Sequence, residues 1–436
     1  MHFSENEFRD FLYDEHRQSF SSLIIGKREP IVWSDEGFPP LAFLLQQKAE
    51  KKINKIINNI EELTLSAKEL RLDKEGDSTT RIDLLGNSEM SGLTIIELKK
   101  SKQTERQAFT ELLAYANHFC SIFPGLKESS LTSILVAPME TRTVRDAYVQ
   151  ELVANQKNVL ALIPEEIKGK IFLNVFYPDE SYYHWFENNL LDDRSMLTVV
   201  LSFSIIDGWI DTDFNTGQSN IPEYSKNALN TISNSISHKL ESLGIHSLVY
   251  ASQQWGEIAQ VFPFPNTIVI AAINPFASFR TGIYEEEICG ESKDGRLEEL
   301  QSIYDQLHES EKAYWLELFE ARFYNDLIRT VREEFEFCFK NTENEYIQKE
   351  ISIPDWYGFK TSMIESVFVH HVDIYLTGLL REIYADYIEY IYSTGIDEIY
   401  YYDDLPKYSY KTLRSFFAVW EILRGLGVGQ EIDDVQ

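Results

Sequence analysis

The sequence predicts an α/β protein whose amino-terminal part is a mixed sheet flanked by helices. Short apolar runs alternate with segments of helical periodicity between residues 61 and 178. A turn-rich stretch, GNSEMSG at 86–92, separates two of these runs and predicts a hairpin. Because strands that alternate with helices form sheets covered on their faces, this pattern indicates helices packed on a mixed sheet.

The expected elements follow the chain in order. Residues 1–60 are predicted to be mostly helical, because apolar residues recur at helical spacing in ENEFRDFLYDEH and in LAFLLQQKAEKKINKIINNI. Shorter alternating runs predict strands and a hairpin over 61–100. A helix is expected over 104–119, where one apolar stripe is formed by Phe109, Leu112, Leu113, Ala116 and Phe119. The buried strand LTSILVAP, the helix TVRDAYVQELVANQ and the strands VLALI and KIFLNVFY complete this part.

The rest of the chain is predicted to form two further domains. A small α/β domain is expected from the strands MLTVVLSFSII, HSLVYAS and NTIVIAAIN and a helix that ends at Gly244. From residue 291 the pattern predicts an acidic, all-helical domain rich in Glu, Tyr and Phe. The predicted domains are therefore 1–178, 179–290 and 291–436, in line with a prior of about 150 residues per domain.

Composition and charge bound the function. Three widely spaced cysteines cannot form a disulfide framework, and the amino terminus lacks the pattern of a secretory signal, so we expect a cytoplasmic protein with no membrane partner. The net charge of −30 argues against nucleic-acid binding at first sight. Its distribution changes that reading: residues 1–178 carry 22 Lys and Arg against 26 Asp and Glu, so most of the negative charge lies after 178.

Two predicted strands carry acids where apolar residues are expected. In RIDLLG, Asp83 alternates with Ile82 and Leu84, and in TIIELK, Glu97 and Lys99 share one face. If GNSEMSG closes the hairpin, Asp83 approaches Glu97, and two neighbouring carboxylates repel unless a cation lies between them. Oxygen ligands select Mg²⁺ or Mn²⁺, and such a site suits phosphodiester hydrolysis. A structural cluster of ion pairs is the alternative.

The helix after the second strand continues this pattern. Gln107, Glu111 and Tyr115 are spaced by four residues, so they are expected on one helix face, opposite the apolar stripe. The Glu-x-Lys pattern alone is weak, because the chain contains it at 50, 97, 166 and 291. Only the occurrence at Glu97 lies in an apolar strand, with an upstream aspartate and a helix directly after it.

In this stretch the chain resembles the PD-(D/E)xK, restriction-endonuclease-like nuclease superfamily, and is similar to NucS-type and RecB-like nuclease domains. The resemblance covers roughly residues 40–178 and implies that Asp83 and Glu97 bind metal, that Lys99 is the catalytic lysine and that the Leu98 carbonyl is a backbone ligand. We see no family match for 179–436.

The resemblance also implies roles on the helices. Many relatives place a Gln four residues before a Tyr. Here Glu111 occupies that position before Tyr115, and it is expected to be a further metal ligand or a group in the outer shell of the metal. Gln107, one turn earlier, is the alternative for the role of the Gln. Many relatives bring an acid from the first helix, for which Glu50 is our choice and Glu7 the alternative.

These features predict a Mg²⁺- or Mn²⁺-dependent DNA endonuclease, in prokaryotic anti-phage or restriction-type defence by analogy with similar fusions. Two alternatives stay open: a repair or structure-specific nuclease, and a nucleic-acid-binding scaffold with an inactive nuclease fold. The carboxy-terminal half is expected to sense or regulate. Its Tyr-rich segment, 373–404, is a candidate contact for a second copy or a regulatory protein.

Overall fold

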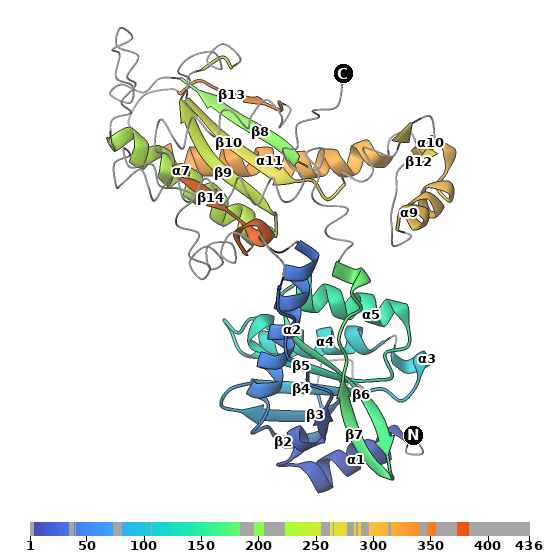
Figure 1. The fold of residues 1–436 in the computed structure, drawn as a ribbon. Coiled ribbons are helices and arrows are strands. Elements are labelled where there is room, and N and C mark those ends of the chain that lie inside the picture. Colours follow the sequence, from blue (N-terminus) through green and yellow to red (C-terminus); the bar gives the residue numbers. More distant parts are fainter. Residues whose placement is uncertain are drawn as a thin grey trace. The chain divides into compact units, whose positions relative to one another are not determined.

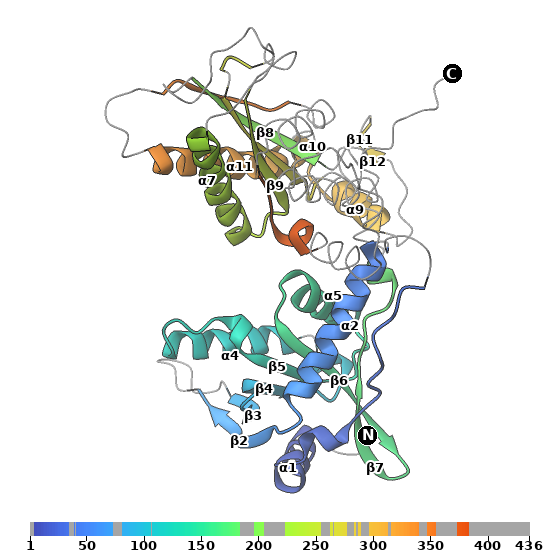
Figure 2. The same ribbon diagram turned by 60° about the vertical axis from the view of Figure 1, so that its left-hand side comes forward.

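The structure is a computed structural model that divides into two compact units, Met1–Tyr183 and His184–Gln436. Figures 1 and 2 show both units, which are described separately below. The described residues are 4–34, 39, 41–72, 81–105, 107–183, 196–204, 223–253, 262–264, 266–276, 283–284, 287–288, 296–312, 315–339, 347–354 and 373–382.

The first unit is built on a seven-stranded mixed sheet in the order β1-β7-β6-β5-β4-β3-β2. Strands β4, β5 and β6 are parallel, whereas β2, β3 and β4 form an antiparallel meander. The short edge strand β1 pairs with β7. The strand bounds are β1 Ile24–Ile25, β2 Thr64–Arg71, β3 Arg81–Ser88, β4 Gly92–Leu98, β5 Thr132–Val136, β6 Asn158–Ile167 and β7 Lys170–Val175.

Helices flank this sheet. Helix α4 packs against the central strand β4, α2 packs against β6, and α1 packs against β2 and β3. The bounds are α1 Glu5–His16, η1 Phe20–Leu23, α2 Leu41–Asn59, α3 Lys102–Glu105, α4 Ala108–Ile122, η2 Glu128–Ser130, α5 Arg142–Val149 and η3 Gln150–Ala154. The predicted helices, hairpin and strands of this part are confirmed, and the expected helix over 104–119 is divided into α3 and α4.

The second unit contains a five-stranded antiparallel sheet in the order β13-β8-β10-β9-β14. The larger elements are β8 Met196–Phe203, α7 Glu223–Ser242, β9 Ser247–Gln253, β10 Asn266–Ile273, α11 Trp315–Phe339, β13 Lys349–Ser352 and β14 Ile374–Leu376. The smaller ones are β11 Ile283–Tyr284, β12 Glu287–Ile288, α9 Arg296–Asp305 and α10 Glu309–Lys312. Gly244, with φ of +71°, follows α7 and supplies the left-handed residue that commonly ends a helix.

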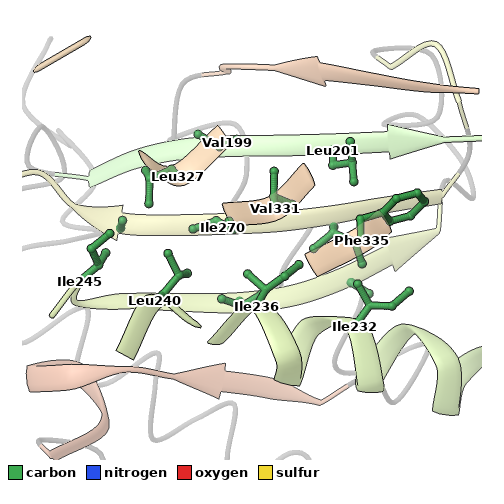
Figure 3. Close-up of a cluster of buried hydrophobic side chains, with 14 of the residues drawn as sticks. Val199, Leu201, Ile232, Ile236, Leu240, Ile245, Ile270, Leu327, Val331 and Phe335 are labelled. Carbon is green, nitrogen blue, oxygen red and sulfur yellow. The ribbon is translucent and has the colours of Figure 1, made fainter. Parts of the chain in front are cut away.

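One apolar core joins the described strands of this unit to α7 and α11. Val199 and Leu201 of β8, Ile270 of β10 and Ile236 of α7 pack with Val331 of α11, as Figure 3 shows. Residues from both predicted segments, 179–290 and 291–436, therefore line the same core.

The prediction that residues 291–436 are all helical is wrong. β13 and β14 lie in this segment and pair with β8 and β9 at the two edges of the sheet. The reason is their length: strands of four and three residues are too short to give a readable alternation of apolar and polar positions. Most of the Tyr-rich segment predicted to contact a partner, 383–404, lies outside the described residues.

No helix among the described residues has the length and apolar composition needed to cross a bilayer.

The shared core predicts a large loss of stability when α11 is truncated on its buried face. The Phe335 side chain is 2% exposed, and its ring centroid lies 4.9 Å from that of Phe203. We expect Phe335→Ala to lower the free energy of unfolding by about 3–5 kcal/mol, measured by urea denaturation of the full chain. Phe337 is 71% exposed on the same helix, so Phe337→Ala is the matched control and should change this free energy by less than about 0.5 kcal/mol. Equal effects would contradict the packing of α11.

Candidate active site

The β3–β4 hairpin brings Asp83 and Glu97 together. Leu84 pairs with Ile96 in the antiparallel register, so the next pair along the ladder is Asp83 with Glu97. The backbone N–H of Leu98 donates to Asp83 Oδ2 at 2.9 Å and fixes the aspartate at the end of β4. Leu98 therefore meets the site through its N–H, and a role for its carbonyl stays a prediction.

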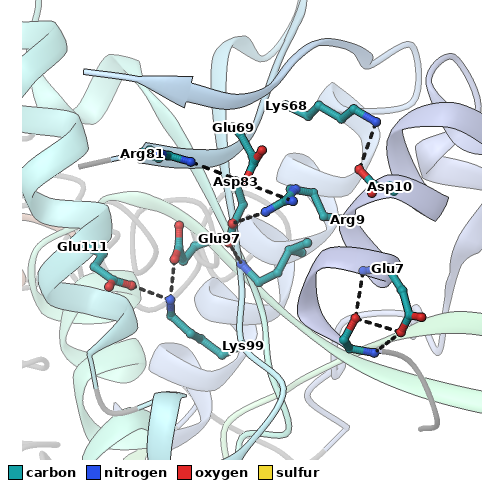
Figure 4. Close-up of polar contacts among 12 residues, drawn as sticks. Glu7, Arg9, Asp10, Lys68, Glu69, Arg81, Asp83, Glu97, Lys99 and Glu111 are labelled. Carbon is teal, nitrogen blue, oxygen red and sulfur yellow. Dashed lines mark hydrogen bonds and ion pairs between the residues drawn. The ribbon is translucent and has the colours of Figure 1, made fainter. Parts of the chain in front are cut away.

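Lys99 lies between two carboxylates (Figure 4). Its Nζ is 2.6 Å from Glu97 Oε1 and 2.6 Å from Glu111 Oε2. The lysine side chain is 9% exposed and the Glu97 side chain 3% exposed, whereas Glu111 is 34% exposed on α4. The predicted trio Asp83, Glu97 and Lys99 is thus assembled at one point, with Glu111 beside it.

Burial dominates the ionisation of these groups. Desolvation raises the pKa of Glu97 to about 10, and the negative charge of Asp83 adds to the shift while Lys99 opposes it. Desolvation also raises the pKa of Asp83, against the hydrogen bond from Leu98. The carboxylates around Lys99 raise the pKa of its ammonium despite its burial, so Lys99 stays protonated at neutral pH.

Three charged residues missed by the sequence analysis adjoin Asp83. Arg9 of α1 is buried, and its guanidinium lies 3.7 Å from Asp83 Oδ1 and 3.2 Å from Glu69 Oε1. Arg81 Nη1 lies 3.8 Å from the same Glu69 oxygen. The elements that carry these residues could be predicted from the sequence. A contact between α1 and β2 could not, because it depends on the tertiary fold and has no local sequence pattern.

Of the acids on α1, Glu5 is the one coupled electrostatically to Asp83, Lys99 and Glu111. Burial raises the pKa of Glu5, and the nearby charges of Asp83 and Glu111 add to this shift. Lys99 and a hydrogen bond from the Lys100 backbone oppose it. The sequence carried a usable signal, because Glu5 and Arg9 are four residues apart and so share a helix face.

Glu7 has a different task at the start of α1. Its backbone N–H donates to the Ser4 hydroxyl at 3.2 Å, and the Ser4 backbone N–H donates to Glu7 Oε2 at 2.7 Å. This reciprocal pair of hydrogen bonds is a capping box, which the spacing Ser-x-x-Glu predicts. Glu7 is exposed and serves the helix end.

Glu50 is held in a separate polar cluster. It is 1% exposed, forms an ion pair with Arg28 at 3.2 Å, and accepts hydrogen bonds from the Ile31 backbone N–H at 2.8 Å and from Gln46 at 3.1 Å. Its carboxylate therefore ties the segment before α2 to that helix, and the described contacts do not join it to Asp83 or Glu97.

The predicted helix face is only partly realised. Gln107 precedes α4 as its N-cap residue and is exposed, and the contacts of the described residues do not join it to the trio. Tyr115 is buried on the apolar side of α4, where its hydroxyl donates to the Arg81 carbonyl at 2.6 Å. Burial raises the pKa of Tyr115, and the charge of Glu97 adds to this shift. Of these three helix residues, Glu111 is the one that contacts Lys99.

The donor atoms of this cluster are carboxylate oxygens, which are the ligands that hard divalent cations prefer. Among the described residues, no three His, Cys, Asp or Glu side chains converge on one metal position. Glu97 Oε2 is nevertheless buried without a hydrogen-bond partner in the described structure, and Asp83 lies next to it. The cluster would carry two net negative charges if all of its groups were ionised, because it has four carboxyl groups and two cations. Its members are Glu5, Asp83, Glu97, Glu111, Arg9 and Lys99. A divalent cation would offset that charge and favour the ionised form of Glu97, so the carboxylate donors fit such an ion.

Comparison with protein-family models, with curated proteins and with solved structures found no significant match. The assignment of function therefore depends on the side chains described above, and the resemblance to the PD-(D/E)xK superfamily stays a prediction.

Burial of Glu97 predicts a distinctive pH dependence of stability. Because its folded-state pKa is raised, the stabilisation from its protonated form is complete below the unfolded pKa of about 4.5 and is lost as pH rises towards about 10. In EDTA at pH 8, Glu97→Gln should raise the free energy of unfolding by about 1–4 kcal/mol, measured by urea denaturation, and should flatten its decline with pH. Glu7→Gln, at an exposed cap, should leave that decline unchanged. A Glu97→Gln protein no more stable than wild type would contradict this account.

Proposed function

We propose that the chain is a divalent-metal-dependent nuclease that hydrolyses phosphodiester bonds in DNA, with its active site at Asp83, Glu97 and Lys99. The observation that carries the proposal is the unpartnered, buried Glu97 Oε2 next to Asp83, at a cluster whose four carboxyl groups outnumber its two cations. A purely structural ion-pair cluster would gain by neutralising these charges with its own residues, since unpaired buried charge is costly.

Asp83 and Glu97 would hold the cation, with Glu5 and Glu111 near enough to influence it electrostatically. When bound, a divalent cation neutralises a phosphate oxygen and makes a coordinated water more acidic. Arg9 and the Leu98 N–H hold Asp83 in place. The carboxylates thus stay fixed by protein contacts before any substrate binds.

Lys99 acts as a charged donor in this proposal. Glu97 and Glu111 keep it protonated, so it is unsuited to accept a proton. An ammonium has three N–H donors, and two carboxylate contacts leave one donor for a water or a phosphate oxygen. Lys99 would therefore orient the attacking water or stabilise the negative charge that develops on the phosphate.

The proposed biological setting is prokaryotic anti-phage or restriction-type defence, with the second unit as the sensing or regulatory part. Repair is the nearest alternative, and substrate preference separates the two: plain duplex favours defence, whereas flaps, mismatches or ends favour repair. An inactive scaffold is the other alternative, because Lys99 is already neutralised by two carboxylates.

The central test is cleavage by the full chain. Supercoiled plasmid, linear duplex, single-stranded DNA and RNA are each incubated with Mg²⁺, Mn²⁺ or EDTA, and products are separated on gels. We expect metal-dependent cutting of DNA that falls by about 100-fold or more in Lys99→Ala and in Glu97→Gln, because both groups contact the reacting phosphate or its cation. Cutting that persists in EDTA or survives both substitutions would contradict the proposal, and tight DNA binding without any cutting would favour the scaffold.

A matched pair on α1 tests which acid belongs to the site. Glu5→Gln removes a carboxylate coupled to Asp83 and Lys99, so we expect weaker Mn²⁺ binding, measured by calorimetry, and at least ~10-fold slower cleavage. Glu7→Gln keeps a capping residue at the same helix end and should match wild type in both measurements. The reverse order of effects would return Glu7 to the site.

A further inference from the structure

Two arginines share one carboxylate at the edge of the site. Glu69 Oε1 lies 3.2 Å from Arg9 Nη2 and 3.8 Å from Arg81 Nη1, as Figure 4 shows. The Arg9 side chain is 8% exposed, whereas Glu69 and Arg81 are 46% and 43% exposed. A ligand that comes from solvent therefore meets Glu69 and Arg81 before it meets Arg9.

The position of Glu69 is unfavourable in two independent respects. Lys68 pairs with Leu84 and Leu70 pairs with Ile82, which puts Glu69 at the level of Asp83 on the neighbouring strand, and both carboxylates contact Arg9. Neighbouring like charges destabilise a sheet. Its backbone has φ of +49°, in the left-handed region that a glutamate rarely adopts within a strand. Such strain persists where the surroundings hold it, and it gathers at functional sites.

Arg9 also has an unused donor. Its Nε is buried and lacks a hydrogen-bond partner in the described structure, although its other nitrogens contact Asp83 and Glu69. A guanidinium has five N–H donors, arranged to suit carboxylates and phosphates alike. Glu69 therefore satisfies the two arginines incompletely.

We propose that Arg9 and Arg81 form a phosphate-binding pair beside Asp83, and that the Glu69 carboxylate occupies this pair until a nucleic-acid phosphate replaces it. The proposal rests on the proposed function for the identity of its ligand, a phosphodiester of the DNA backbone. Exchange begins at the Glu69–Arg81 pair, which is half exposed on both sides and therefore weak. A phosphate accepts bidentate hydrogen bonds from arginine at least as well as a carboxylate does. Glu69 thereby lowers the affinity for nucleic acid and keeps Arg9 and Arg81 neutralised in its absence.

The test measures binding without cleavage. The full chain is titrated onto a short fluorescein-labelled DNA duplex in EDTA, by fluorescence anisotropy at several KCl concentrations, as wild type, E69Q, R81Q and the E69Q/R81Q double variant. Arg81 is substituted rather than Arg9 because it is half exposed, so the fold should tolerate its loss. E7Q removes one exposed negative charge from α1 and is the matched control.

We expect E69Q to tighten binding about threefold, since a competing ion pair is removed. R81Q should weaken binding and reduce the slope of log affinity against log salt by about 1. In the R81Q background the gain from E69Q should shrink, because part of its effect passes through Arg81. E7Q should bind as wild type does.

The outcomes separate this proposal from the nuclease proposal. The same gain from E69Q in both backgrounds would overturn the phosphate pair, since Glu69 would then merely repel DNA. Binding that behaves as expected, in a protein that never cuts with Mg²⁺ or Mn²⁺, would support the pair and overturn the nuclease. A wild-type chain that does not bind the duplex would overturn both.

Discussion

The burial of Glu97 at the end of a central strand is the constraint on which the rest of the site depends. β4 has sheet neighbours on both sides and α4 packed against it, so its carboxylate has lost most of its water. The two neighbours of Glu97 act on it in opposite directions: the Lys99 ammonium lowers the pKa of Glu97, and the Asp83 carboxylate raises it. Glu111 in turn holds Lys99, so a single desolvated group organises residues from β3, β4 and α4.

The electrostatics explain why the site tolerates so many acids. Among the described residues, the two cations paired with Asp83 and Glu97 are both shared: Lys99 bridges two carboxylates and Arg9 bridges two more. Sharing lowers the repulsion without removing it, because acids still outnumber cations. Such a surplus of acids favours additional positive charge, which is the property that the proposed metal-dependent phosphodiesterase would require.

The local sequence pattern was sufficient to predict the β3–β4 hairpin, but it did not predict which residues surround the two acids of that hairpin. Asp83 and Glu97 could be placed together because period-two alternation and one turn fix the register of adjacent strands. Glu50 was chosen as the helical acid from the family resemblance, yet its helix packs against β6 and its carboxylate pairs with Arg28 instead. Glu69 could not have been found from local pattern, since its ion pair with Arg9 depends on α1 packing against β2. In the second unit, β13 and β14 escaped prediction because edge strands this short carry almost no periodicity.

The two edges of the seven-stranded sheet have a consequence for self-association. An exposed edge strand offers unpaired backbone groups to any neighbouring chain, and long, flat, apolar edges nucleate aggregates. β1 is only two residues long, and β2 carries Lys68, Glu69 and Arg71 with a left-handed residue interrupting its extended course. Neither edge therefore provides a template for strand addition. The irregular charged strand β2 is thus a poor template for extending the sheet of one molecule into that of the next.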